Sequence, residues 1–281
     1  MRWLGLVLVV LVVLLAACGE APAPPPGAGV RIATTSPAVG IMLRDFGAQD
    51  LAVGRSGYDV ALDPALPVVG DAAGIDLERL SAVGATHVYY ESGASAVPVG
   101  LTELADDVGF EVRAFELTSL EQLIELASDV HRLVSDEVDA GRPPVERFED
   151  ALEHNTDLAG AGRVLLLMPG TPAAALGPRS VHHEVLIRIG GTPAIEDGRP
   201  YMPLDAEDVL EIGPDAIVLL APGKAEDWRD LLGPLAELPV PAIEYGRVAV
   251  LRDEEVLMAS TSTLRYADAL RQRLESWAAE R

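Results

Sequence analysis

The sequence predicts an α/β protein of two Rossmann-like lobes, each with a mostly parallel sheet, joined by a single long interlobe helix. The first observation is a repeat, because residues 76–84 (DLERLSAVG) and 205–213 (DAEDVLEIG) share Asp, Glu and Gly in register. Each copy is typical of a capped short helix that ends at glycine and leads into a strand. The second is a polar helical stretch between the copies, at 119–160. The third is the alternation of strands and helices in both halves, which is typical of parallel sheets.

Residues 1–17 have the pattern of a secretory signal peptide. Arg2 precedes an apolar run over 3–17 that is too short to span a membrane. A basic start, an apolar centre and small residues before a cleavage point are typical of such signals. Leu15-Ala-Ala-Cys18 resembles the bacterial lipoprotein cleavage box, which implies cleavage before Cys18 and lipidation of its thiol. An ordinary signal peptide with an incidental cysteine is the alternative.

The segment 18–29 is predicted to be a lipidated tether. Its proline-rich run (APAPPPGAG) cannot pack as a core and should be extended, at ~3 Å per residue. It would hold the folded part near a membrane, on the periplasmic or the extracellular face. Because Cys18 is the only cysteine, no disulfide can form within the mature chain.

The N-terminal lobe is expected at 30–118 and the C-terminal lobe at 161–281. In the first lobe, strands are expected at 30–35, 51–54, 85–90 and 111–115, with helices at 39–46, 76–84 and 101–108. In the second lobe, strands are expected at 163–168, 214–219 and 247–251, a loop at 169–178, and helices at 180–189, 205–213, 228–238 and 263–279. The continuous apolar run at 163–168 is typical of a strand with both faces covered.

The linker at 119–160 contains two helical runs. Apolar residues follow helical spacing from Leu120 to Val134. Pro143 and Pro144 end this run, and prolines are tolerated at the first turn of the next, at 145–158. A helix that joins two similar lobes leaves a cleft between them, and the loops at the carboxyl ends of the strands should line it.

The composition restricts the function classes. The net charge of −23 argues against nucleic acid or an anionic membrane surface as a partner, although a solvated, salt-adapted surface is the simplest interpretation of this charge. The apolar content of 49% indicates a folded chain. No Ser-His-Asp order with a nucleophile turn is present, and the loop at 170–177 lacks the Lys-Ser/Thr ending of a phosphate loop. Neither an enzyme nor a bound cofactor is therefore expected.

Several stretches, taken in order, resemble the class III periplasmic binding proteins. They are RIATTSP at 31–37, LPVVG at 66–70, GPRS at 177–180, LDAE at 204–207, GPDAIV at 213–218 and RVAVL at 247–251. Those proteins serve ABC importers of ferric siderophores, haem and cobalamin. The resemblance implies two α/β lobes joined by one long helix, a ligand held between them and little hinge motion. Ala85-Thr86 departs from the Pro-Asp usual in the family.

Glu78 and Glu207 are the candidate permease-docking residues. Each is expected at the second position of a helix, where the helix dipole keeps a carboxylate ionised. One carboxylate on each lobe can form ion pairs with arginines of a partner. The family resemblance implies that matching glutamates dock onto a permease dimer. The alternative is that both residues only stabilise their own helices.

The candidate ligand-binding residues follow the expected strands, where a cleft would be lined. They are Ser36, Tyr58, Tyr90, Arg179 and Tyr201. Tyrosines with Arg179 and Arg55 suit a ligand with a flat or aromatic body and acidic groups, and a tyrosine phenolate can ligate haem iron.

His182 and His183 do not predict a metal site. Adjacent side chains on a helix point ~100° apart, whereas helical metal pairs are spaced i, i+4. Whether either histidine contacts the ligand stays open.

We therefore expect a lipid-anchored binding protein that captures an iron complex (a siderophore or haem) or a corrinoid and delivers it to an ABC permease. The alternative is a membrane-tethered sensor or assembly subunit of the same fold without a transport role.

Overall fold

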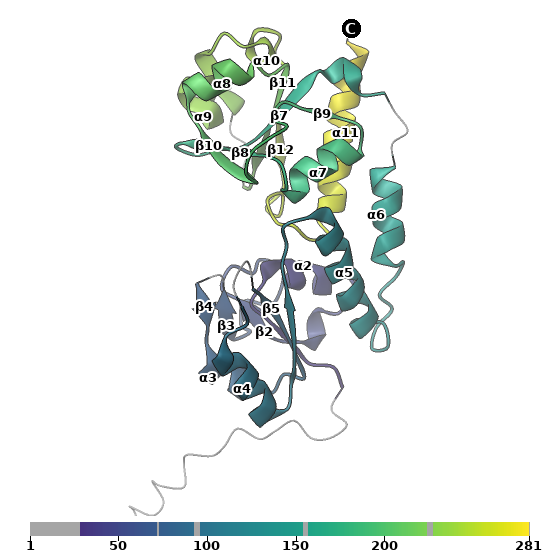
Figure 1. The fold of residues 1–281 in the computed structure, drawn as a ribbon. Coiled ribbons are helices and arrows are strands. Elements are labelled where there is room, and N and C mark those ends of the chain that lie inside the picture. The colour runs from purple at the N-terminus through teal and green to yellow at the C-terminus, as the bar shows by residue number, and fades with distance from the viewer. Residues whose placement is uncertain (1–28, 72, 93–95, 154–156, 224–226, 281) are drawn as a thin grey trace, which may run out of the picture.

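The structure is a computed structural model that describes residues 29–71, 73–92, 96–153, 157–223 and 227–280. Two α/β lobes lie one above the other, with helices along one side (Figure 1). This confirms the predicted fold class of two lobes with mostly parallel sheets. The predicted signal peptide and nearly all of the predicted tether lie outside the described residues. Among the helices that the structure describes, none has the length and apolarity needed to cross a membrane.

The N-terminal lobe has a six-stranded sheet in the order β4-β3-β2-β1-β5-β6. The strands are β1 Ile32–Thr34, β2 Ala52–Ser56, β3 Val68–Asp71, β4 Gly74–Ile75, β5 His87–Glu91 and β6 Glu111–Phe115. Only β4 runs antiparallel to its neighbour. The helices are α2 Pro37–Asp45, α3 Leu77–Ala82 and α4 Val99–Val108, with a 3₁₀ turn at Gln49–Leu51. Successive residues of β1 face opposite sides, because Ile32 packs with α2 and Ala33 packs with α3 and α4.

The C-terminal lobe has a mixed sheet in the order β10-β8-β7-β11-β12, with β9 paired to β7. The strands are β7 Arg163–Met168, β8 Ala173–Leu176, β9 Thr192–Pro193, β10 Tyr201–Leu204, β11 Ala216–Ala221 and β12 Val248–Arg252. The helices are α7 Val181–Arg188, α8 Ala206–Ile212, α9 Trp228–Leu232, α10 Pro241–Glu244 and α11 Thr263–Ala279, with 3₁₀ turns at Ala159–Ala161 and Gly233–Glu237. The prediction of a loop throughout 169–178 was wrong, because β8 pairs antiparallel with β7 and β10.

The two repeat copies form capped helices, as predicted. The Asp76 carboxylate accepts a hydrogen bond from the backbone N–H of Arg79, and Asp205 caps α8 in the same way with a reciprocal capping box. Both copies then pass through a left-handed glycine, with φ of +63° at Gly84 and +54° at Gly213. Glycine adopts this conformation without the Cβ clash of other residues.

Thr86 stands where the resembled family usually has aspartate, and this replacement leaves the start of strand β5 intact. The Thr86 hydroxyl accepts from the backbone N–H of Arg31 at 2.9 Å, and at the matching place the Asp215 carboxylate accepts from Arg163 N–H at 2.8 Å. Both arginine side chains also donate to carbonyls at the end of the neighbouring helix. Threonine therefore supplies the oxygen that aspartate supplies in the other lobe.

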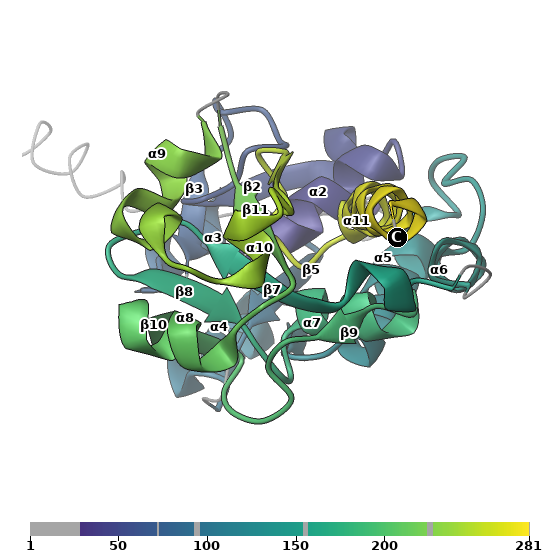
Figure 2. The ribbon, with the colours of Figure 1, turned by 90° about the horizontal axis from the view of Figure 1, so that it is seen from above.

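The prediction of a single long interlobe helix was wrong. The linker forms two separate helices, α5 Leu120–Val134 and α6 Pro144–Leu152, which pack against each other. The break is explained by Gly141, with φ of +71°, and by Pro143 and Pro144, which cannot supply the N–H groups of a continuing helix. Seen from above, α5, α6 and α11 gather on one side of the molecule (Figure 2).

One apolar core connects the two lobes along this helical side. It contains Met42 of α2, Leu123 of α5, Phe148 of α6, Val185 of α7 and Leu270 of α11, each at most 1% exposed. Since packed interiors resist deformation, this shared core fixes the lobes to each other in place of a continuous helix.

A polar cluster also joins the lobes, next to this core. The Arg44 guanidinium at the end of α2 pairs with Glu255 of the C-terminal lobe, and Arg265 donates to the same carboxylate at 2.6 Å. Asp45 accepts from the Thr261 hydroxyl at 2.7 Å. Glu255 is buried, and hydrogen bonding to Arg44 and then to Arg265 holds its carboxyl pKa below the usual range.

Candidate ligand-binding cleft

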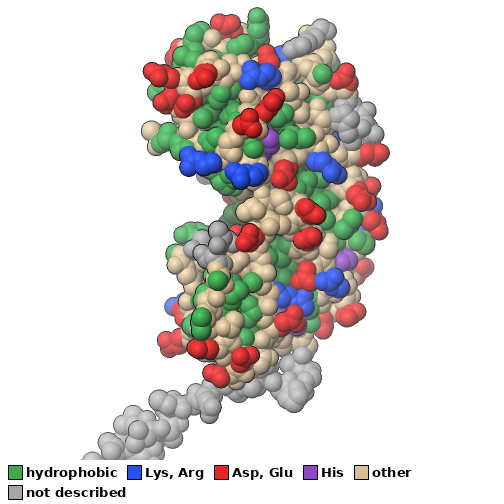
Figure 3. Space-filling model, viewed as in Figure 1, with side chains coloured by type: hydrophobic (Ala, Val, Ile, Leu, Met, Phe, Trp, Pro, Cys, Tyr) green, Lys and Arg blue, Asp and Glu red, His purple; other side chains and the backbone are tan. Residues whose placement is uncertain are grey.

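The molecule is hollowed between the lobes, on the side away from α11 and α6 (Figure 3). The carboxyl ends of the parallel strands in both lobes face this notch (Figure 1). Ligands of α/β proteins bind beyond these ends, where loops leave the sheet. The notch therefore matches the cleft expected from the sequence.

A small pocket of about 110 Å³ lies in the notch, and chain segments from several places form it. Its walls are Leu117 and Thr118 of the segment that crosses between lobes, Arg179 to His182, Pro200, Tyr201 and Ala259. Two of the predicted ligand residues, Arg179 and Tyr201, are thus brought together.

Arg179 has an unusual backbone. Its φ is +66°, the only positive φ of a non-glycine residue in the described part of the chain. This conformation costs a residue with a Cβ ~1 kcal/mol and is common at functional sites. The side chain is exposed and donates only to the Gly198 carbonyl, at 3.2 Å, with no ion pair among the residues described. Ser180 follows as the N-cap of α7.

Tyr201 lies on the C-terminal lip of the cleft, with 55% of its surface exposed. Partial burial raises the pKa of its phenol, and the negative charge of Glu91 raises that pKa further. Because Glu91 ends β5 in the other lobe, the two lips lie within electrostatic reach of each other. The neighbouring Arg199 is exposed and, within the described residues, forms no ion pair. The sequence placed Glu91 at the end of a strand that lines the cleft, but it did not single out Arg199, although the Arg199-Pro-Tyr run offered a signal.

Tyr58 lies on the N-terminal lip, with 61% of its surface exposed. It belongs to the loop after β2, which Arg55 holds in place by donating to the carbonyls of Ser56 and Pro64, each at 3.1 Å. Arg55 therefore positions the loop and is not presented to a ligand. Hydrophobic side chains gather on this lip, whereas Lys and Arg side chains gather on the opposite one (Figure 3).

Ser36 and Tyr90 do not line the pocket in the cleft. Ser36 is fully buried, and its hydroxyl accepts from Ala38 N–H as the N-cap of α2. Tyr90 is half-buried against the apolar cluster of α3 and α4. Their positions support structural roles and do not support the predicted ligand contact.

Comparisons with known proteins agree with this architecture. No protein-family model and no curated protein matches the chain. A periplasmic haem-binding protein from Pseudomonas aeruginosa is 20% identical, with a TM-score of 0.66 over 90% of this chain and 94% of that one. The chain has the fold of the class III periplasmic binding proteins. This confirms the two-lobed α/β fold that the sequence resemblance implied.

Two further solved structures show the same fold. The vitamin B12-binding protein BtuF of Vibrio cholerae is 18% identical, with a TM-score of 0.63 over 88% of this chain and 97% of that one. A siderophore-binding protein from the fuscachelin gene cluster of Thermobifida fusca is 16% identical, with a TM-score of 0.66 over 89% and 98%. At these identities, the likeness establishes the fold.

Both histidines of α7 are buried and bonded to backbone. The His182 Nε2–H donates to the Val256 carbonyl at 2.7 Å, and its ring packs edge-on against Tyr266. Burial lowers the pKa of His182, so its imidazole is neutral. The His183 Nε2 lies 2.9 Å from the Ile195 carbonyl. No group of residues able to hold a metal ion occurs in the part of the chain that the structure describes.

Glu78 and Glu207 are both exposed, each at the second position of its helix. Their helices, α3 and α8, lie on the side where the notch opens, one in each lobe (Figure 1). The geometry is compatible with docking, which stays a prediction.

Proposed function

We propose that this protein is the substrate-binding component of an ABC importer and holds its cargo in the cleft between the lobes. The observation that carries this is the pair of exposed arginines, Arg179 and Arg199, beside Tyr201 in a chain of net charge −23. A cationic side chain without an ion pair inside the protein is available to pair with a negatively charged group of a ligand. The energy for transport would come from the importer's ATPase, and the chain itself would do no chemistry.

The cargo is an iron complex (a siderophore or haem) or a corrinoid, the classes bound by proteins of this fold. Arg179 and Arg199 favour the ligands among these classes that carry carboxylates, since guanidinium groups pair with carboxylates in bidentate geometry. The exposed rings of Tyr58 and Tyr201 suit a flat or apolar body. A tyrosine phenolate at either place can ligate iron.

Delivery rests on Glu78 and Glu207, which would engage arginines of a permease dimer. Two exposed carboxylates, one on each lobe, can make this contact at the same time. The Cys18 lipid would keep the protein at the membrane surface, on the periplasmic or extracellular face.

The experiment is an absorbance or calorimetric titration of the purified folded part with haem, a ferric siderophore and cobalamin. We expect one ligand class to bind, and Arg179→Gln to weaken that binding while Arg188→Gln, which changes an exposed arginine at the far end of α7, does not. In cells, deletion of the permease should abolish uptake. A phenotype that persists without the permease would favour the sensor or assembly role.

A further inference from the structure

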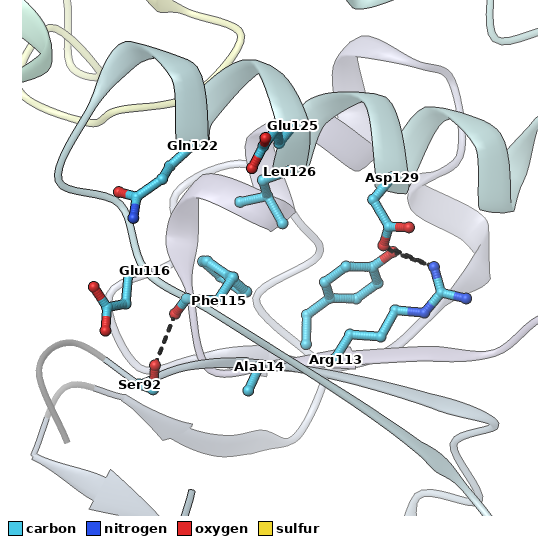
Figure 4. Close-up of a pocket in the computed structure, with 10 residues that line it drawn as sticks. Ser92, Arg113, Ala114, Phe115, Glu116, Gln122, Glu125, Leu126 and Asp129 are labelled. Carbon is cyan, nitrogen blue, oxygen red and sulfur yellow. Dashed lines mark hydrogen bonds and ion pairs between the residues drawn. The ribbon is translucent and has the colours of Figure 1, made fainter. Parts of the chain in front are cut away.

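A second pocket lies on the N-terminal lobe, between the edge strand β6 and the helix α5 (Figure 4). Its volume is about 450 Å³, which is within the range of small-molecule sites. It shares no lining residue with the pocket in the cleft. It is therefore a separate cavity.

One end of this pocket is electrostatically balanced. The Asp129 carboxylate accepts from the Tyr89 hydroxyl at 2.9 Å and from the Arg113 guanidinium at 2.7 Å, and it also pairs with Arg132. The pair of Asp129 and Arg113 is visible at the right of Figure 4. The charges are paired there, and this end of the site has a structural role.

The rest of the pocket is acidic and apolar. Glu116 follows β6, and Glu125 projects from α5 (Figure 4). Both are exposed, and neither forms an ion pair among the residues that the structure describes. Phe115 and Leu126 form the apolar wall between them.

Backbone groups of the edge strand add to the negative potential. The Phe115 carbonyl accepts from Ser92 N–H, on the β5 side. Since successive residues of a strand alternate in direction, Ala114 presents its carbonyl to the open edge. The positive end of α5 is already satisfied, because Ser119 accepts from Gln122 N–H and Glu184 accepts from Leu120 N–H at 2.7 Å.

We propose that this pocket binds a small organic cation with a flat apolar body. The body would lie against Phe115 and Leu126, and the positive group would lie between Glu116 and Glu125. Two carboxylates without partners attract a cation, and an aromatic face adds a cation–π contact. The cleft, with its two arginines, would select the opposite charge.

The test uses benzamidine as the probe and benzamide as its uncharged analogue, titrated by calorimetry at about 0.15 M salt to screen distant charges. Benzamidine should bind at least about tenfold more tightly than benzamide, a factor that corresponds to ~1.4 kcal/mol. The double variant Glu116→Gln/Glu125→Gln should lose that difference. Ala114→Trp, which fills the pocket from the exposed edge, should abolish binding while the variant unfolds at an unchanged temperature.

Two control variants separate this site from general charge and from the cleft. Glu121→Gln removes an exposed carboxylate of α5 that does not line the pocket, and Arg179→Gln alters the cleft. Both control variants should bind benzamidine with the same affinity as the wild-type protein. Equal binding of benzamide, retained affinity in the double variant, or an equal loss in Glu121→Gln would overturn the proposal. The cleft function could fail without affecting any of these results.

Discussion

Glu255→Gln removes the charge at the centre of the polar cluster that joins the lobes. The carboxylate is buried and binds two arginines, Arg44 from the N-terminal lobe and Arg265 from its own lobe. Glutamine keeps the shape and one acceptor oxygen, so the packing around it should be unchanged. The substitution therefore reports on charge pairing between the lobes.

The expected cost is about 2 kcal/mol of unfolding free energy. Breaking a fully buried pair by removal of one partner costs ~3–5 kcal/mol. Here the side chains of Arg44 and Arg265 are 34% and 49% exposed, so they can recover hydration. The value therefore falls into the range of a charged hydrogen bond, ~1.5–3 kcal/mol. For a chain of this size, such a loss lowers the melting temperature by roughly 4–8 °C.

The pH dependence gives the reasoning a second test. Arg44 and Arg265 hold the folded-state pKa of Glu255 below its usual value, so the stabilisation is present at neutral pH. It is lost as the pH falls through that folded-state pKa. Urea unfolding should show that the wild-type protein has a larger free energy of unfolding than Glu255→Gln at pH 7. This difference should disappear in acid. Glu254→Gln, an exposed neighbour, is the control, and an equal loss there, or a difference that persists in acid, would refute the argument.

Four further predictions follow from the same features. Cys18→Ser should move the protein from the membrane fraction to the soluble fraction, since the acidic body offers no other membrane affinity; unchanged fractionation would contradict the lipid anchor. Arg179→Gly should unfold at the same or a higher temperature, because glycine relieves the left-handed strain, yet bind cargo more weakly in a titration. Glu78→Ala and Glu207→Ala should each cost under about 0.5 kcal/mol of stability but reduce uptake, and the double variant should import least. Small-angle scattering should show little compaction on cargo binding, because a shared core joins the lobes, and a large change would argue for a hinge between α5 and α6.

Local signals accounted for most of the fold. The repeat at Asp76 and Asp205 fixed a cap, a short helix, a glycine turn and a strand in each lobe, because each of these depends on a few neighbouring residues. Apolar runs located the central strands β7 and β11 for the same reason. The exposure of Glu78 and Glu207 could also be predicted, since both lie on the helix face opposite the apolar residues.

Features that depend on tertiary packing could not be predicted. The two helical runs on either side of Pro143 and Pro144 were predicted, but the packing of α5 against α6, in place of one continuous interlobe helix, depends on tertiary contacts. The strand β8 is short and Ala-rich, and it forms only because β7 and β10 offer partners. Ser36 and Tyr90 follow or end strands as expected, but the face toward which each side chain points decided their burial.

The most direct test of the central claim is the affinity of the purified protein for its cargo, measured with Arg179 intact and replaced by glutamine. A ferric siderophore, haem or a corrinoid should bind with one ligand molecule per chain at micromolar or lower concentration. Arg179→Gln should weaken this binding about tenfold or more, which corresponds to the loss of one charged hydrogen bond. Absence of binding for all three classes, or equal affinity with and without the Arg179 guanidinium, would contradict the central claim.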